Sequence, residues 1–253
     1  MIRSFLYLIT LSLWIQACST AEDQNSQPAA LPTEVPIMKV SSSLAMESKQ
    51  DSIDPILHNR KYRRLKSEIA LHLQAIKSDT SLQDEMRYDS LKHYVSHILI
   101  DSIFSYWIGT PWDFNGYTDK PRVGEIACGY FVSTTIRDLG VPINRYKVAQ
   151  KAAAYIIKDL CDPQSIQRFT SFEKMSSLLE QQADNEIFIV GLDFHVGFLF
   201  RRRGKLYFAH SNYINSEGVI IEEAEHSVAL GHSRAYVLGN LSSNKILFSP
   251  WLP

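Results

Sequence analysis

The chain has 253 residues, of which 45% are hydrophobic, and its formal net charge is -1. This length and composition allow one sizeable domain with an appendage, and the near-neutral charge gives no reason to expect nucleic acid or an anionic membrane surface as a partner. The three cysteines, Cys18, Cys128 and Cys161, are too few for a disulfide scaffold and form no CxxC pair.

The first residues have the pattern of an export signal. Arg3 precedes an apolar run over 5–15, which is too short to span a bilayer comfortably. The run leads to Ala17-Cys18, and a small residue before a cysteine resembles the processing site of bacterial lipoproteins. This resemblance implies a signal peptide over 1–17, a lipid on Cys18 and a location anchored at the cell envelope. The alternative is an ordinary cleaved signal followed by an incidental cysteine.

The next part of the chain changes from an aperiodic to a helical pattern. Residues 18–50 are rich in Ser, Ala, Gln, Pro and Glu, which predicts a flexible tether. Apolar residues at three- and four-residue steps predict helices over 53–77 and 81–107. We therefore expect a helical extension over 51–89 and a main domain over 90–253. The first helix carries a basic cluster, which is typical of a solvated helix face and, as the alternative, of a site for an anionic polymer. The cluster comprises Arg60, Lys61, Arg63, Arg64 and Lys66.

The remainder predicts an α+β fold. A loop over 109–124 is rich in Gly, Pro, Asp and Asn, and helical patterns follow over 127–139, 146–160 and 171–182. Strand patterns then come one after another, which favours helices packed on an antiparallel sheet over alternating βαβ units. These strands are expected over 186–191, 194–201, 205–210, 218–222, 234–239 and 244–248.

One cysteine and two histidines lie where they can form a catalytic group. Cys128 opens a predicted helix, whose N-terminal N–H groups favour the thiolate. His195 and His210 lie on strands joined by a predicted hairpin, so their side chains can share one face. In this hypothesis Cys128 attacks a carbonyl carbon, His195 moves the proton and His210 orients the ring of His195. Asn212 and Asp193 are the alternative orienting residues.

Four motifs in this order resemble the NlpC-like cell-wall cysteine peptidases, compact relatives of papain. The resemblance covers about residues 90–240 and implies a papain-like α+β fold. It further implies hydrolysis of an amide through a thioester, with no metal or organic cofactor, and peptide stems of peptidoglycan as the substrate. The motifs are Gly109-Thr110-Pro111-Trp112, Cys128-Gly129-Tyr130-Phe131-Val132, His195-Val196-Gly197 and Phe208-Ala209-His210.

The chain also departs from that family. Members usually have Asp or Ser before the cysteine and Tyr where this chain has Trp112, so the oxyanion donors must differ. The backbone N–H of Cys128 and the hydroxyl of Tyr117 are the candidate replacements. We expect Trp112, Tyr117 and Asn212 to contribute to binding, in a protein that acts as a monomer. The departures motivate a second hypothesis, an inactive relative that serves as a binding or scaffold protein of the cell envelope.

Three further possibilities concern thiols and metals. Cys161 is interpreted as a small core residue, against the alternative of a disulfide with Cys128 that would silence the nucleophile. A zinc site built from Cys128, His195 and His210 is a third hypothesis. His93 and His97 have the helical spacing of two metal ligands, but the pattern offers no third ligand.

Overall fold

The structure, a computed structural model, describes residues 54–81 and 83–252. These residues belong to one compact unit. The expected signal peptide, Cys18 and the tether over 18–50 lie outside the described residues. Within the described part of the chain, no helix has the length and apolar character needed to cross a bilayer.

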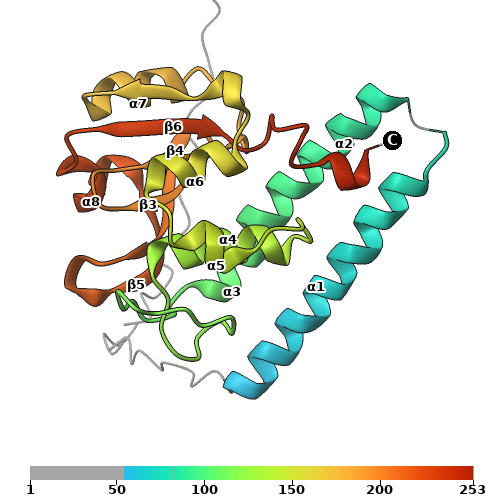
Figure 1. Cartoon of the computed structure of the whole chain (residues 1–253), viewed down its shortest axis with the longest axis horizontal. Helices are drawn as coiled ribbons and strands as arrows, with labels where there is room; N and C mark the ends of the chain where they lie inside the picture. The colour runs from blue at the N-terminus through green and yellow to red at the C-terminus, as the bar shows by residue number, and fades with distance from the viewer. Residues whose placement is uncertain (1–53, 82, 253) are drawn as a thin grey trace, which may run out of the picture. The chain divides into compact units, whose positions relative to one another are not determined.

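A six-stranded antiparallel sheet forms the centre of this unit (Figure 1). Its strand order is β1-β6-β2-β3-β4-β5, and each pair of neighbours is antiparallel. The expectation of an α+β fold with helices on an antiparallel sheet is therefore confirmed. The strands are β1 (Gln167–Phe169), β2 (Ile187–Gly191), β3 (Val196–Arg202), β4 (Lys205–Asn212), β5 (Gly218–Glu223) and β6 (Tyr236–Asn240).

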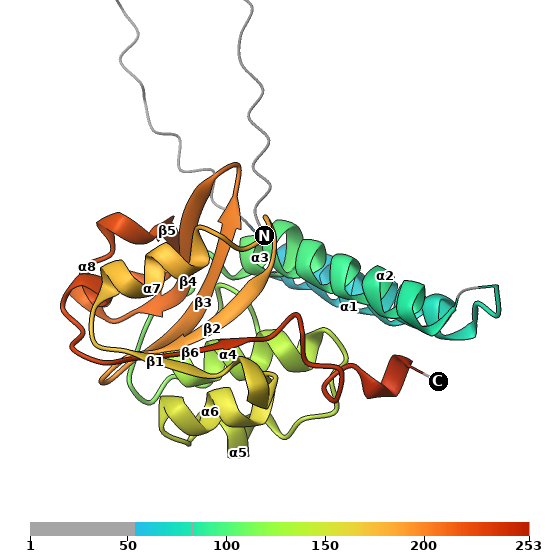
Figure 2. The same ribbon diagram turned by 90° about the horizontal axis from the view of Figure 1, so that it is seen from above.

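Helices cover both faces of the sheet, as Figure 2 shows. Alternate residues of a strand point to opposite faces, so adjacent residues of one strand join different cores. Phe198 packs with Phe131 of α4 in the larger core, while Leu199 packs in a second core with Met175 of α7. The helices after the loop are α4 (Cys128–Asp138), α5 (Arg145–Ala149), α6 (Ala153–Leu160), α7 (Phe172–Leu179) and α8 (Val228–Gly231).

The N-terminal helices pack into the same unit. They are α1 (Pro55–Ser78) and α2 (Asp84–Ile98), followed by a π-helical turn, η1 (Leu99–Ile103), and by α3 (Phe104–Trp107). Figure 1 shows α1 and α2 as a long hairpin, and the expected boundary near residue 90 falls inside α2.

A buried hydrogen-bond chain joins α1 to the helix of the cysteine. The hydroxyl of Tyr62 donates to Asp138 Oδ2 at 2.8 Å and accepts from the indole N–H of Trp107 at 2.9 Å. Because Asp138 is the last residue of α4, this chain supports the end of the helix opposite to Cys128. These contacts indicate that the helical extension braces the main domain. Of its basic cluster, Arg64 pairs with Glu68 along the helix and Lys66 reaches Asp138.

Two expectations about elements are wrong. The pattern over 146–160 predicted one helix, but the chain forms α5 and α6 with a break at 150–152. Residues 244–248 are not a strand but a turn, because the side chain of Asn244 accepts from the Leu247 N–H and donates to Leu160 O. The short β1 was missed. The remaining segments are 3₁₀ turns, η2 (Pro163–Ser165), η3 (Ile214–Ser216), η4 (Ala224–His226) and η5 (Ser249–Trp251).

Candidate active site

Cys128 is the first residue of α4, as expected. The residue is partly exposed, and its sulfur accepts hydrogen bonds from the backbone N–H groups of Val196, Gly129 and Cys128 itself. The contact with Val196 places the sulfur beside the residue that follows His195. Gly129 is needed here, since a Cβ at this position would lie 2.5 Å from the carbonyl oxygen of Ala149. The close approach of α4 to α5 thus explains the glycine after the nucleophile.

Three side chains on or beside β3, β4 and β5 are joined by hydrogen bonds across the sheet. His195 Nε2 lies 2.8 Å from His210 Nδ1, and His210 Nε2 lies 3.1 Å from Glu222 Oε1. Both histidines are almost fully buried, whereas Glu222 is partly exposed on β5. The expectation that His210 contacts the far nitrogen of His195 agrees with this geometry. We refer to His195, His210 and Glu222 as the relay.

The relay assigns the tautomer of each ring. Burial raises the pKa of Glu222, but hydrogen bonds from His210 and Ser227 outweigh this and hold the pKa below its ordinary value. The carboxylate therefore only accepts, so His210 donates from Nε2 and is left with an accepting Nδ1. His195 must then donate from Nε2, which leaves the lone pair on its Nδ1. That nitrogen is the one available as a base.

Strand register brings the relay together. Phe198 pairs with Ala209 in the β3–β4 hairpin, which closes through a two-residue turn with positive φ at Arg203 and Gly204. Gly197 makes room for the relay, because a Cβ there would lie 2.8 Å from His210 Cβ and 2.6 Å from Phe208 Cε2. The glycine of the His-Val-Gly motif is therefore a packing requirement of the second histidine.

Cys128 and His195 line the same open cavity of about 680 Å³. Aromatic rings surround them, and the ring of Tyr213 lies edge-on to His195 with centroids 5.1 Å apart. No hydrogen bond joins the thiol to the imidazole directly within the described structure. Catalytic hydrogen bonds of unliganded enzymes are often long and shorten in the substrate complex. A reaction at this site would need the thiol and the imidazole to come within hydrogen-bond distance.

The resting thiol and imidazole are both uncharged. Burial raises the pKa of the Cys128 thiol, although the three backbone N–H groups oppose it. Burial and the neighbouring His210 hold the pKa of His195 well below its ordinary value. The expectation that the helix N-terminus makes Cys128 a ready thiolate is therefore wrong, because desolvation exceeds the effect of the backbone donors. The base has to remove the proton as the sulfur attacks.

The chain matches no protein-family model, and it matches no curated protein and no solved structure significantly. The site therefore has to be interpreted from its own geometry.

The other expected site residues divide into two groups. Trp112 lines the cavity beside Tyr213, with ring centroids 6.4 Å apart. Tyr117 does not line it, since its exposed ring lies outside against Tyr130. Asn212 does not reach His195, because its side chain binds Glu217 and the backbone N–H of Ile214. Tyr117 as an oxyanion donor and Asn212 as an orienting residue are thus not supported by the geometry.

The carboxylate of Asp193 is also engaged elsewhere. Its Oδ2 accepts the backbone N–H of Arg234 at 2.9 Å. Of the three candidates for orienting His195, only His210 makes the contact.

Neither thiol is part of a disulfide. Both Cys128 and Cys161 are free, and Cys161 is buried between α6 and the sheet, where it contacts Gly239. The interpretation of Cys161 as a small core residue is confirmed. Burial raises the pKa of its thiol strongly, which makes it inert.

The zinc hypothesis finds no geometric support. The facing nitrogens of His195 and His210 bond to each other, and the ligand atoms of these two residues and Cys128 do not cluster. Among the described residues only Glu223, Glu225 and His226 bring three ligand-type atoms within 4.8 Å of one another, in an exposed acidic group away from the thiol.

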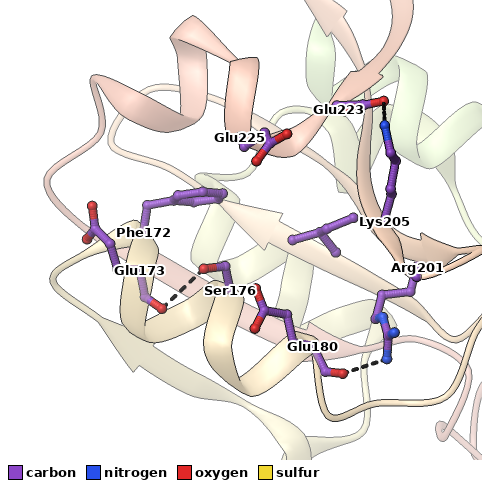
Figure 3. Close-up of a pocket in the computed structure, with 10 residues that line it drawn as sticks. Phe172, Glu173, Ser176, Glu180, Arg201, Lys205, Glu223 and Glu225 are labelled. Carbon is purple, nitrogen blue, oxygen red and sulfur yellow. Dashed lines mark hydrogen bonds and ion pairs between the residues drawn. The ribbon is translucent and has the colours of Figure 1, made fainter.

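A second cavity, of about 320 Å³, lies between α7 and the β3–β5 strands (Figure 3). Both of its basic side chains have partners in the protein. Lys205 pairs with Glu223 at 2.6 Å, and Arg201 donates to the backbone carbonyls of Glu180 and Gln182. This cavity contains neither the thiol nor the relay.

Glu222 and Tyr213 are the site residues that sequence reasoning missed. Glu222 comes at the end of the predicted strand over 218–222 and has no motif of its own. The signal that could have found it is strand register. β5 pairs Glu222 with Phe208, which lies two residues before His210 on β4 and so shares its face of the sheet. Tyr213 immediately follows β4, and nothing in the pattern marks it.

Replacement of Glu222 by glutamine tests the relay. The amide removes the charge and can present N–H instead of oxygen to His210, which destabilises the assigned tautomers. We expect kcat to fall by about tenfold to a hundredfold with KM little changed, and we expect the pH dependence of kcat to shift. Glu225→Gln, an exposed neighbour, is the control and should leave both unchanged. A purely structural role for Glu222 would lower thermal stability without moving the pH profile.

The uncharged resting state makes a prediction about alkylation. Iodoacetamide reacts with the thiolate, so alkylation of Cys128 should be slow at neutral pH. Because the pKa of Cys128 is raised, the rate should rise only as the pH passes above the range in which an ordinary thiol ionises. Peptide mapping at a series of pH values provides the measurement. A plateau of fast alkylation on the acid side would indicate a thiolate–imidazolium pair and contradict the assignment.

Proposed function

We propose that the protein is a cysteine hydrolase that cleaves an amide bond through a thioester. The observation that carries this proposal is the shared cavity of Cys128 and His195, with His195 held by His210 and Glu222. A buried structural histidine would need one partner, whereas here the chain of hydrogen bonds leaves one imidazole nitrogen free at a cavity that contains a thiol.

The reaction would proceed in two steps. His195 Nδ1 takes the proton of Cys128 as the sulfur attacks the carbonyl carbon, and the imidazolium then protonates the leaving amine. The relay stabilises the imidazolium, since His210 accepts from it and Glu222 supplies the negative charge. Backbone N–H groups at the start of α4 and the indole N–H of Trp112 are the proposed oxyanion donors. Water, activated by the neutral His195, then hydrolyses the thioester.

We propose a divergent NlpC-like enzyme with a papain-like fold. The antiparallel sheet, the cysteine at the start of a packed helix and the two histidines on adjacent strands all support this proposal. The motifs imply peptide stems of peptidoglycan as the substrate. The export pattern before Cys18 implies that the enzyme is anchored at the envelope, where those stems are found.

The test is hydrolysis of purified peptidoglycan fragments by the folded protein. We expect new amine termini and shortened stem peptides for the wild-type chain and none for Cys128→Ala. Cys161→Ala is the matched control, because it removes the other described thiol away from the cavity. Equal release of products by the wild type and Cys128→Ala would overturn the proposal.

A binding or scaffold protein of the envelope is the second candidate. The raised pKa of Cys128 and the lack of a direct bond to His195 favour it. In that case peptidoglycan fragments would bind to the cavity, and Cys128→Ala would bind them as tightly without any product in either protein.

A further inference from the structure

The walls of the cavity are formed by aromatic rings from separate parts of the chain. Trp112 and Phe114 come from the loop before α4, Tyr130 comes from α4 itself, and Phe194 and Tyr213 flank the ends of β3 and β4. Phe194 is 96% exposed and Phe114 is 78% exposed. Exposed apolar side chains that gather at one cavity are typical of a binding site for an apolar group.

Charge is nearly absent from the same walls. Among the described residues that line the cavity there is no carboxylate and no arginine, and Lys151 is the only permanently charged side chain. The ammonium of Lys151 is already paired with Asp159, with Nζ and Oδ2 2.5 Å apart. A substrate that carried charged groups into the cavity would lose hydration there without gaining a free counter-charge.

Cys128 lines the same cavity as these rings, so they are available to contact a group attached to the attacked carbonyl. Phe194 immediately precedes His195 and lines both this cavity and a smaller hollow of about 200 Å³, which Cys128 and His195 also line. Asp193 lines the smaller hollow as well, but its carboxylate accepts the backbone N–H of Arg234. A substrate bound at the thiol can therefore contact Phe194 in either hollow. The thiol and the imidazole are both uncharged before the reaction. An apolar ligand that displaces water from the site therefore leaves no charge without hydration.

We propose that the cavity selects an acyl donor that is uncharged and apolar next to the cleaved bond, as an alanyl residue of a stem peptide is, and that Phe194 and Phe114 are its specificity-determining residues. This inference rests on the proposed function, and it narrows the substrates to those whose acyl part next to the cleaved bond is neutral and apolar. In the reaction the sulfur forms a bond to the acyl carbon, the leaving group departs with the electrons of the cleaved bond, and water later releases the carboxylic acid.

Acylation by p-nitrophenyl esters tests the selection. Hexanoate, phenylacetate and monosuccinate esters differ in the acyl group but share one leaving group, whose release is measured by absorbance. After subtraction of the rate with Cys128→Ala, we expect the apolar esters to react about tenfold faster or more than the succinate. In Phe194→Ala the KM for hexanoate should rise by about tenfold with kcat within about twofold. Leu71→Ala removes another exposed apolar side chain, on α1, and should change nothing.

A binding measurement separates this inference from the proposed reaction. Saturation-transfer NMR on Cys128→Ala should detect N-methylhexanamide in the cavity and much less N-methylsuccinamate, with the signal lost in Cys128→Ala, Phe194→Ala. If binding follows this preference while no ester acylates Cys128, the proposed function is wrong and the selective cavity stands. Equal binding and equal rates for the apolar and charged probes, or no effect of Phe194→Ala, would overturn the inference.

Discussion

Replacing His195 by alanine should lower the rate of amide hydrolysis by about 10³-fold. In the proposed reaction the thiol is uncharged at rest, so the sulfur has no other route to lose its proton during the attack. An enzyme with a preformed thiolate would tolerate the loss better, because its nucleophile would already be ionised. The size of the effect therefore tests the uncharged resting state as well as the identity of the base.

Folding has to be controlled in that experiment, because His195 is buried against Phe208 and Tyr213. His195→Gln fills most of the volume and should be as inactive as the alanine variant, with a smaller change in thermal unfolding. His232→Ala, at an exposed position after α8, is the matched control and should retain full activity. Retention of more than about a tenth of the activity by both His195 variants would exclude His195 as the base.

Gly197→Ala should destabilise the fold, with a loss of about 2 kcal/mol in the free energy of unfolding. The added Cβ would lie 2.6 Å from the ring of Phe208 and 2.9 Å from the carbonyl oxygen of Ala209. Both neighbours are fully buried, so neither can move aside easily. The clash also involves His210, so activity should fall even where the variant remains folded.

Urea unfolding followed by circular dichroism measures the loss. Gly231→Ala is the control, since a Cβ there meets nothing within 4 Å and its stability should change by no more than about 0.5 kcal/mol. A Gly197→Ala protein as stable and active as the wild type would show that β3 and β4 pack less tightly around the relay than described.

Much of the fold could be predicted from local patterns. The α4 helix and the β3–β4 hairpin carry strong signals, an apolar helical stripe after Cys128 and two strand patterns separated by a turn with Gly204. The split between α5 and α6 carries no such signal, because the residues on either side of 150–152 continue the helical pattern. The apolar residues over 244–248 predict a strand. The segment forms a turn instead, because the side chain of Asn244 hydrogen-bonds to the backbone of Leu247 and Leu160.

The part of the candidate site that lies within sequence motifs was predictable. Cys128, His195 and His210 follow from residue type and order, and hairpin geometry restricts the orienting residue to two neighbours on β4. Glu222 could not be found in this way, since its role depends on the pairing of β5 with β4.

The protonation state was predicted wrongly for a similar reason. Helix position alone favours a thiolate at Cys128, but its pKa depends on burial, which the packing of the rest of the chain creates.

The measurement that tests the central claim most directly is peptide mapping by mass spectrometry after reaction with p-nitrophenyl hexanoate and an acid quench. We predict a thioester on the peptide that contains Cys128, none on the peptide that contains the buried Cys161, and no thioester at either position in His195→Ala. A hexanoyl group on another residue of the wild-type chain, or equal labelling of Cys128 in His195→Ala, would contradict a thiol activated by His195.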